Sequence, residues 1–221
     1  MPTIAASKPK SAITVDDAGC RECQRLATFL DRVKEDNPAY FCKPVPPFGA
    51  ASAPLVIVGL APGMHGANRT GRPFTGDFAG YLLYDTLKKF GFARGTFSPD
   101  GDDDLQLLGC RISNAVKCLP PDNKPEPAEV KRCNHFLAAD LAQRGAKVVL
   151  ALGTVAHGAA LMALGMKKSA YDFSHGAAHA LPSGLHLVDS YHCSRYNTNT
   201  RRLTTDMFEA VFARARALVD A

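Results

Sequence analysis

The sequence predicts an α/β protein with three layers, α/β/α, in which helices cover both faces of a central four-stranded parallel sheet. Four short apolar runs alternate along the chain with segments of helical hydrophobic spacing. This alternation is typical of parallel sheets, because each crossover between parallel strands usually runs through a helix. A length of 221 residues with 46% hydrophobic residues suits one globular domain. We therefore expect residues 1–15 to form a flexible tail and residues 16–221 to form a single domain.

The first predicted strand, PLVIVGL at residues 54–60, is apolar, rich in β-branched residues and ends in a glycine and a leucine. Short runs of this kind are typical of strands that are buried on both faces. The other three predicted strands are CRISNAV at 110–116, AKVVLAL at 146–152 and GLHLVDS at 184–190.

Helices are predicted where apolar residues recur at spacings of three and four. The helix expected over 77–93 has Asp77 at or near its N-cap and Gly91 near its C-cap. The last helix is expected to begin near Asp206, with Glu209 as a candidate capping-box partner. The remaining predicted helices cover residues 20–34, 127–143 and 154–164.

Charge and hydropathy limit the partners and the cellular location expected for the protein. The net charge of +5 permits a polyanionic partner without requiring one. No apolar run approaches the roughly 20 residues of a membrane-spanning helix, and the N-terminus lacks the apolar core of a signal peptide. We expect a cytoplasmic protein with no membrane partner. There, seven unevenly spaced cysteines do not indicate a disulfide framework.

Three polar segments are expected to meet at one edge of the sheet, since ligands of parallel sheets bind beyond the carboxyl ends of the strands. They are GANRTGRPFTGDFAG at 66–80, NAVKC at 114–118 and SYHCSRYNTNT at 190–200. The first is glycine-rich, but it contains neither the Gly-Lys-Ser/Thr of a P-loop nor the spacing of a dinucleotide fingerprint. Composition alone leaves it as a mobile surface loop or as a loop that brings its backbone against a ligand.

Four cysteines form two pairs. Cys20 and Cys23 make a C-x-x-C, and fourteen residues separate Cys118 from Cys133. Thiolates at such spacings suit zinc or an iron–sulfur cluster. The alternative is four unrelated small core residues, and the spacing does not separate zinc from iron.

The motifs themselves resemble a known family. GLAPGMHGANRTGRPFTGD (59–77), SNAVKC (113–118) and YHCSRYNTNTRRLT (191–204) are similar, in order, to the active-site motifs of type B, or family 5, uracil-DNA glycosylases. The cysteine set resembles that of the iron–sulfur glycosylases of families 4 and 5. The resemblance implies the uracil-DNA glycosylase fold and a structural 4Fe–4S cluster held by Cys20, Cys23, Cys118 and Cys133. It also implies removal of uracil, and often of hypoxanthine or xanthine, from double-stranded DNA.

With this resemblance, four side chains gain expected roles. Phe74 offers a flat face on which a flipped base can stack, and Asn114 has a donor and an acceptor that can contact a base edge. His192 is expected to stabilise the negative charge on the leaving base, and Asp77 to orient water or stabilise the sugar cation. A core phenylalanine, a turn asparagine, a structural histidine and a plain N-cap are the corresponding structural alternatives. The other expected base-binding residues are Gly59, Leu60, Ala61, Pro62, Gly63, His65 and Asn68.

The last motif departs from the family pattern at two positions. Cys193 stands where the family usually has proline, and Arg201 where it usually has glycine. We expect Cys193 to be a small-residue replacement and not a nucleophile. Arg69 and Arg72 are expected either to contact phosphates or to pair with carboxylates. The candidate DNA-binding residues are Arg69, Arg72, Arg195, Tyr196, Asn197 and Arg201.

The favoured hypothesis is thus a monomeric, nucleoid-associated DNA glycosylase. Two other classes stay open from the residues alone. One is a non-catalytic iron–sulfur protein that binds nucleic acid or transfers electrons, and the other is a binding module held together by zinc.

Overall fold

The computed structural model of the chain describes residues 19–143 and 145–221. Its main sheet has six strands in the order β1–β5–β2–β6–β8–β7, of which β5, β2, β6 and β8 are mutually parallel. The predicted four-stranded parallel sheet is therefore confirmed, and one short antiparallel strand extends it at each edge. The strands are β1 (Phe48–Gly49), β2 (Leu55–Gly59), β5 (Cys110–Asn114), β6 (Val148–Leu152), β7 (Ala178–Ala180) and β8 (His186–Ser190), with a separate hairpin of β3 (Ala93–Arg94) and β4 (Gln106–Leu107).

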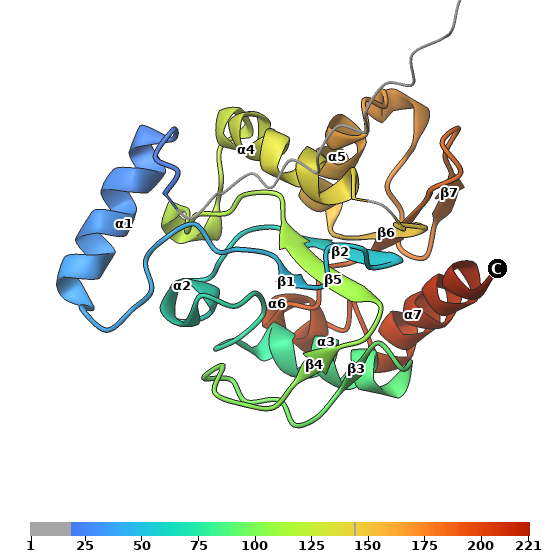
Figure 1. The fold of residues 1–221 in the computed structure, drawn as a ribbon, viewed down its shortest axis with the longest axis horizontal. Helices are drawn as coiled ribbons and strands as arrows, with labels where there is room; N and C mark the ends of the chain where they lie inside the picture. The colour runs from blue at the N-terminus through green and yellow to red at the C-terminus, as the bar shows by residue number, and fades with distance from the viewer. Residues whose placement is uncertain (1–18, 144) are drawn as a thin grey trace, which may run out of the picture.

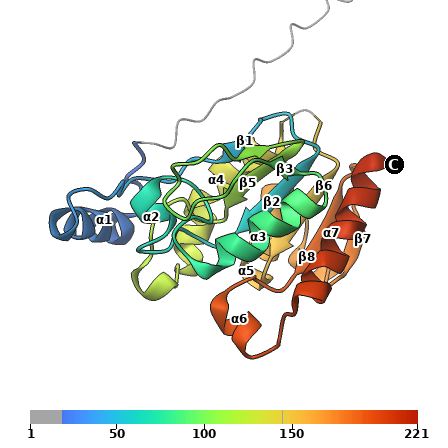
Figure 2. The same ribbon diagram turned by 90° about the horizontal axis from the view of Figure 1, so that it is seen from below.

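Helices cover both faces of the sheet, as predicted (Figure 1). One face packs against α3 (Phe78–Lys89) and α7 (Thr205–Asp220), and the other against α4 (Pro127–Leu141) and α5 (Thr154–Ala163). Seen from below, α3 and α7 lie in front of the strands, while α1 (Gln24–Asp36) lies to one side of the layers (Figure 2).

Burial along the strands explains this arrangement. All five residues of β2 and all five of β6 are buried. Alternate residues of β2 belong to opposite apolar clusters: Leu55 and Ile57 pack with α3 and α7, and Val56 and Val58 pack with α4 and α5. A central strand that is apolar on both faces needs a packed layer on each side, and here helices supply both layers.

Some predicted boundaries are wrong. The first helix begins at Gln24 and not at Cys20, so both cysteines of the C-x-x-C precede it. The last helix begins at Thr205, next to the predicted start near Asp206, and its N-cap is Thr204, whose side chain accepts from the Met207 N–H.

Other segments contain helices or contacts that the sequence did not predict. The glycine-rich segment holds a short helix, α2 (Ala67–Thr70), and the last motif holds another, α6 (Arg195–Asn199). Glu209 does not close a capping box but pairs with Lys89 at 2.5 Å. The expected tail, residues 1–15, lies outside the described residues. Within the described ranges, no helix is both long and apolar enough to cross a membrane.

Candidate functional site

The carboxyl ends of β2 and β5 bring Gly59 and Asn114 side by side, since these two residues are partners in the parallel register. A Cβ on Gly59 would lie 2.4 Å from the Asn114 side-chain oxygen and 2.9 Å from the Phe74 ring. Contacts that short do not occur, so a glycine is required here. Its missing side chain lets Asn114 and Phe74 approach the end of the strand.

Phe74 is held in place by its surroundings. Its φ is +57°, a left-handed conformation that is rare for a phenylalanine, and its side chain is buried. The Tyr84 hydroxyl donates to the carbonyl of the preceding Pro73 at 2.6 Å. A Cβ on Gly80 would lie 2.0 Å from the Phe74 carbonyl oxygen, so α3 approaches this backbone closely. The surrounding packing thus imposes the strained conformation and aims the ring.

His192 follows β8 and stacks on Phe74. The two rings have centroids 5.9 Å apart and planes 23° apart. The Asn197 amide donates to the His192 carbonyl at 2.8 Å and fixes the turn into α6. Burial lowers the pKa of His192 to about 4. The imidazole is therefore neutral at pH 7 and can donate a hydrogen bond without carrying charge.

Asp77 is the N-cap of α3, as predicted, and its side chain accepts from the Gly80 N–H at 3.3 Å. Removal from water raises the pKa of Asp77, and hydrogen bonds from the Gly80 and Ala79 backbone lower it in part. Its carboxylate also faces Gly66, whose added Cβ would lie 3.3 Å away. The carboxylate therefore caps the helix and still opens onto a cavity.

These side chains surround two adjoining spaces. A recess is lined by Ala61, Gly63, Ala67, Phe74, Asp77, Asn114 and His192. A wider cleft of about 770 Å³ shares Ala61, Asp77 and His192 with it. Further along the cleft lie Leu60, His65, the N-terminal residues Thr154 and Val155 of α5, and Arg195. Nine of the predicted site residues thus line these two adjoining spaces: Leu60, Ala61, Gly63, His65, Phe74, Asp77, Asn114, His192 and Arg195.

Not every predicted base contact lies there. Asn68 is fully buried outside the lining of both spaces, and its amide donates to the Cys42 sulfur at 3.4 Å. It supports the loop from behind, so its prediction as a base contact is not supported. Pro62 is buried and lines neither space. His65 is exposed at the cleft, and its Nδ1 lies 2.8 Å from the Tyr40 hydroxyl.

The arginines of the first motif are paired with carboxylates, one of the two roles expected for them. Arg72 forms a two-pronged bond with Asp103 at 2.6 and 2.8 Å, and its side chain is only 14% exposed. The alternative of a phosphate contact is therefore not supported for Arg72. Arg69 pairs with the exposed Asp100 at 2.8 Å and remains near the surface.

The last motif exposes several residues beside the cleft. Tyr196 on α6 is 72% exposed, and the Arg195 guanidinium lies 5.7 Å from the centre of the Phe78 ring. Cys193 is fully buried, burial raises the pKa of its thiol, and its sulfur points at the Ala79 carbonyl. Such a thiol suits the expected small-residue replacement. Arg201 has a φ of +56°, which explains why glycine suits this position.

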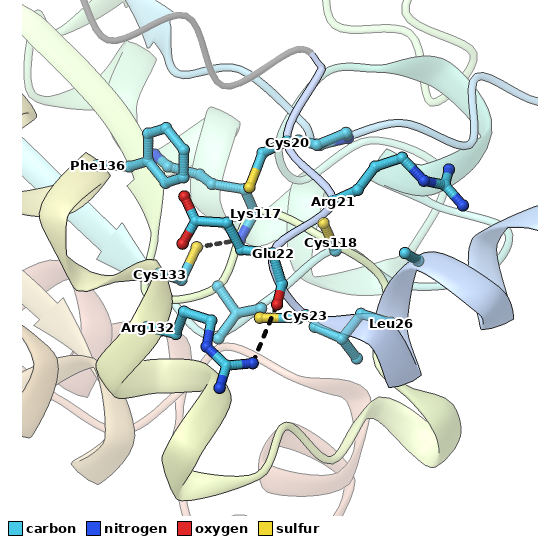
Figure 3. A pocket seen from close by; sticks show the side chains of 13 residues that line it. Cys20, Arg21, Glu22, Cys23, Leu26, Lys117, Cys118, Arg132, Cys133 and Phe136 are labelled. Atoms are coloured by element: carbon cyan, nitrogen blue, oxygen red, sulfur yellow. Dashed lines mark hydrogen bonds between the residues drawn. The ribbon is translucent and has the colours of Figure 1, made fainter.

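The two cysteine pairs line one cavity. Cys20 and Cys23 precede α1, Cys118 follows β5 and Cys133 lies on α4. Figure 3 shows their sulfur atoms turned toward the same space. The lining is otherwise largely apolar, and burial raises the pKa of Cys133 to about 11. Burial also raises the pKa of Cys23, which the neighbouring Arg132 lowers in part. Thiols in such a setting ionise when a metal cation binds.

Sequence reasoning missed a buried charge network between the two sites. The Lys117 ammonium is 2% exposed and lies 2.9 Å from Asp140 and 2.5 Å from the Ser113 hydroxyl. The Lys117 backbone N–H donates to the Cys133 sulfur at 3.4 Å. A lysine inside the strand-end motif SNAVKC is the signal that could have indicated it, because a buried lysine needs a carboxylate partner.

Comparison with known proteins agrees with this geometry. Residues 46–216 match the Uracil DNA glycosylase superfamily. The chain is 44% identical to a protein of Thermus thermophilus named type-5 uracil-DNA glycosylase, over 90% of this chain and 93% of that protein. It is 38% identical to the type-5 uracil-DNA glycosylase of Pyrobaculum aerophilum, over 90% and 88%. A type-4 uracil-DNA glycosylase of Thermotoga maritima is 39% identical over 46% of each chain.

Proposed function

The chain belongs to the uracil-DNA glycosylase superfamily and, within it, to the type-5 glycosylases, and on that premise we propose that it excises uracil from DNA. The reaction is hydrolysis of the N-glycosidic bond, which leaves an abasic site. The observation that carries the proposal is the convergence of Phe74, Asn114, Asp77 and His192 on one recess.

Base recognition falls to Phe74 and Asn114. A base inside a duplex is out of reach, so the nucleotide must rotate into the recess. In the recess, the uracil ring stacks on the Phe74 side chain, a contact worth about 1–3 kcal/mol in other base–aromatic pairs. The Asn114 amide can donate and accept at once, which suits the edge of uracil. The wide adjoining cleft leaves room for hypoxanthine or xanthine, so we extend the proposed substrates to these bases.

Catalysis falls to His192 and Asp77. As the bond to the sugar breaks, negative charge develops on the base, and the neutral His192 imidazole donates a hydrogen bond to it. The Asp77 carboxylate faces the recess from the start of α3. It orients the attacking water and stabilises the positive charge that develops on the sugar. No covalent bond to the protein is required, in keeping with the burial of Cys193.

The cysteine cavity suits a 4Fe–4S cluster, which Cys20, Cys23, Cys118 and Cys133 would hold. The fit rests on four soft sulfur donors that line one largely apolar cavity, with a backbone N–H directed at the Cys133 sulfur. Such a cluster would supply a structural cross-link, since the cysteine cavity shares no lining residue with the recess. The cysteines would tie the segment before α1 to α4 and to the end of β5.

The DNA-facing surface is assigned to α6 and the neighbouring loops. Arg195, Tyr196 and Arg201 are exposed there, and Arg69 keeps part of its surface accessible. The net charge of +5 favours a polyanion. We propose that the protein acts as a monomer on the chromosomal DNA of the cytoplasm, with the last motif entering the duplex. Asn197 has a supporting role in this proposal, because its side-chain amide donates a hydrogen bond to the His192 carbonyl and is not directed at DNA.

The test uses duplexes that each carry one uracil, hypoxanthine or xanthine. Purified protein is incubated with each duplex, free base is measured by chromatography, and abasic sites are measured by alkaline strand cleavage. We expect free uracil and abasic sites in equal amounts. Asp77→Asn protein purified in the same way controls for contaminating glycosylases. Binding without base release, at every salt concentration and pH tried, would leave only the non-catalytic class.

A chemical analysis decides the metal. Iron and inorganic sulfide in equal amounts, with visible absorbance, support the cluster. Zinc with no visible absorbance supports a binding module held together by zinc and overturns the cluster assignment.

A further inference from the structure

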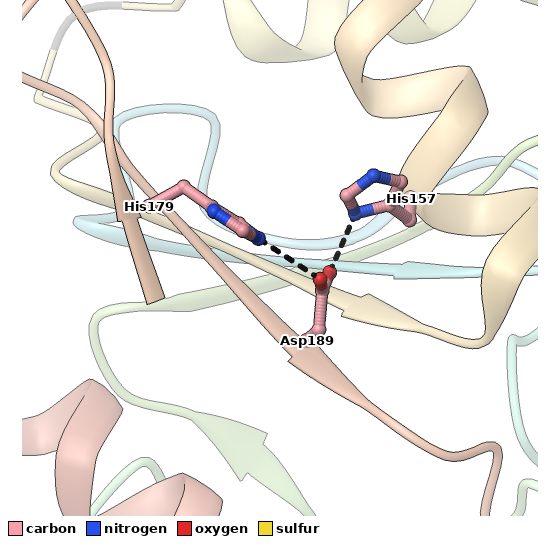
Figure 4. A group of neighbouring side chains, drawn as sticks. All are labelled: His157, His179 and Asp189. Carbon is pink, nitrogen blue, oxygen red and sulfur yellow. Dashed lines mark hydrogen bonds and ion pairs between the residues drawn. The ribbon is translucent and has the colours of Figure 1, made fainter. Parts of the chain in front are cut away.

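A second group of metal-ligating side chains lies outside both sites, beneath the wall of the cleft. His157 on α5, His179 on β7 and Asp189 on β8 place their ligand atoms within 4.8 Å of one another. Figure 4 shows the two imidazoles converging on the single carboxylate. His157 and Asp189 are essentially fully buried, and His179 is 20% exposed, which leaves a route of entry from one side.

The hydrogen bonds of His157 define which ring nitrogen carries its proton. Its Nε2 lies 3.0 Å from the Tyr171 carbonyl oxygen, which can only accept, so Nε2 must donate. In a neutral ring, Nδ1 then carries no proton, and its lone pair faces Asp189 Oδ1 at an N···O distance of 2.8 Å. A lone pair and a carboxylate oxygen cannot hold this approach alone. The approach requires either a proton between the two atoms, on the ring or on the carboxyl group, or a metal ion that both atoms ligate once they have moved slightly apart.

The surroundings match those of a bound metal. Histidines that ligate metals usually donate their other N–H to a backbone carbonyl or a carboxylate, as His157 does to Tyr171. The second imidazole, of His179, turns its Nε2 to the other carboxylate oxygen of Asp189 at 3.3 Å. In a tetrahedral zinc site the ligand atoms lie about 3.3 Å apart. His179 Nε2 already lies at that distance from Asp189 Oδ2, whereas His157 Nδ1 and Asp189 Oδ1 need to separate by about half an ångström.

We propose that His157 Nδ1, His179 Nε2 and the Asp189 carboxylate form a binding site for a divalent transition-metal ion, with zinc as the best match. Two imidazoles and one carboxylate are a common zinc ligand set, and water completes the coordination. The ion joins α5, β7 and β8 three residues before His192. It therefore stabilises the packing of these three elements beneath the active-site edge and takes no part in bond breaking. This inference does not depend on the identity of the excised base.

The test measures zinc bound to the full-length protein by equilibrium dialysis followed by elemental analysis. His179→Ala removes the most accessible ligand at an edge strand, so the variant should fold. His186→Ala is the matched control, because His186 lies on the same strand as Asp189 but outside the group. Any zinc bound at the cysteines is the same in wild type, His179→Ala and His186→Ala, so it does not affect the difference in zinc content between them.

We expect wild type and His186→Ala to bind about one zinc ion more than His179→Ala, or to bind it at least about tenfold more tightly. Added zinc should raise the melting temperature of those two proteins more than that of His179→Ala. Asp189→Asn keeps the side-chain shape and is a second variant for which we expect the same loss. Equal zinc content and equal thermal shifts in wild type and His179→Ala would overturn the proposal and leave a proton as the centre of the group.

Discussion

The Phe74 ring stacks on the His192 imidazole, with ring centroids 5.9 Å apart. The contact joins the first motif, held before α3, to the last motif, held after β8. Each ring therefore limits the position of the other, and the proposed stacking surface and the proposed charge donor cannot move independently.

Phe74→Ala should consequently impair more than stacking. We expect base release to fall for every substrate together, because the variant loses the stacking face and the support of His192. Loss of a buried phenylalanine should also lower the free energy of unfolding by about 3 kcal/mol. Kinetics on each duplex and urea unfolding measure the two effects. Phe212→Ala is the control, since Phe212 is also a buried phenylalanine but packs on Phe208 and lines neither the recess nor the cleft. A selective loss for one base alone would contradict this account.

Asp77→Asn separates catalysis from capping. Asparagine caps helices about as well as aspartate, so the free energy of unfolding should change by less than about 0.5 kcal/mol. We expect base release in single turnovers to fall by about 10²-fold or more, because the amide cannot orient water as a base or balance the sugar cation. Unchanged activity would leave Asp77 with its capping role only.

The pH dependence of stability reports on His192. Its pKa is about 4 in the folded protein against about 6.5 in an unfolded chain. Between these values the unfolded chain binds a proton that the folded protein does not. The free energy of unfolding should therefore fall as the pH decreases from 6.5 toward 4. We expect His192→Gln to lose part of this slope in urea unfolding at pH 7 and pH 5. Identical slopes would mean that His192 titrates normally.

The strong elements of this fold are visible in the sequence, but its local geometry is not. Uninterrupted apolar runs predicted the bounds of β2 and β6 to within about two residues. A strand that is buried on both faces must be apolar at nearly every position, so its sequence is easy to recognise. The short edge strands β1 and β7 carry no such signal, since pairing with a neighbour alone defines them. The family motifs indicated Phe74, Asp77, Asn114 and His192, and the structure brings these residues together.

Other features depend on partners distant in the sequence. The sequence could not assign Arg72, because Asp103, 31 residues later, occupies its guanidinium. The sequence could not place Asn68 for a similar reason, since the fold directs its amide nitrogen toward the Cys42 sulfur. The His157–His179–Asp189 group was also missed, because its members come from three separate elements with no motif spacing.

Tyr196→Ala tests the part of the protein proposed to enter the duplex. The ring is the most exposed of the large hydrophobic side chains described and lies on α6 beside the cleft. A side chain that fills the gap left by a flipped nucleotide matters only when an opposite strand is present. We expect base release from duplexes to fall severalfold and release from single strands to change little. Tyr81→Ala, at another exposed tyrosine, should alter neither. Equal losses on both substrates would argue against insertion.

Cys20→Ser tests the structural role of the cysteine cavity. Removing one of four ligands should lower the iron content, the melting temperature and the soluble yield together. Cys42→Ser is the matched control, because Cys42 is also half-buried but lies outside the cavity. Loss of iron with an unchanged melting temperature would refute a structural role.

The position of β2 in the sheet has a consequence for biosynthesis. It is the first of the four parallel strands to leave the ribosome, yet it occupies the middle of the sheet between β5 and β6. Both of its hydrogen-bonding edges must therefore wait for partners that are translated more than 50 and 90 residues later. During that interval an apolar, β-branched segment with two open edges is available to other nascent chains. Slower synthesis would lengthen this exposure, so chaperone supply and expression temperature should govern the recovery of folded protein more than its final stability does.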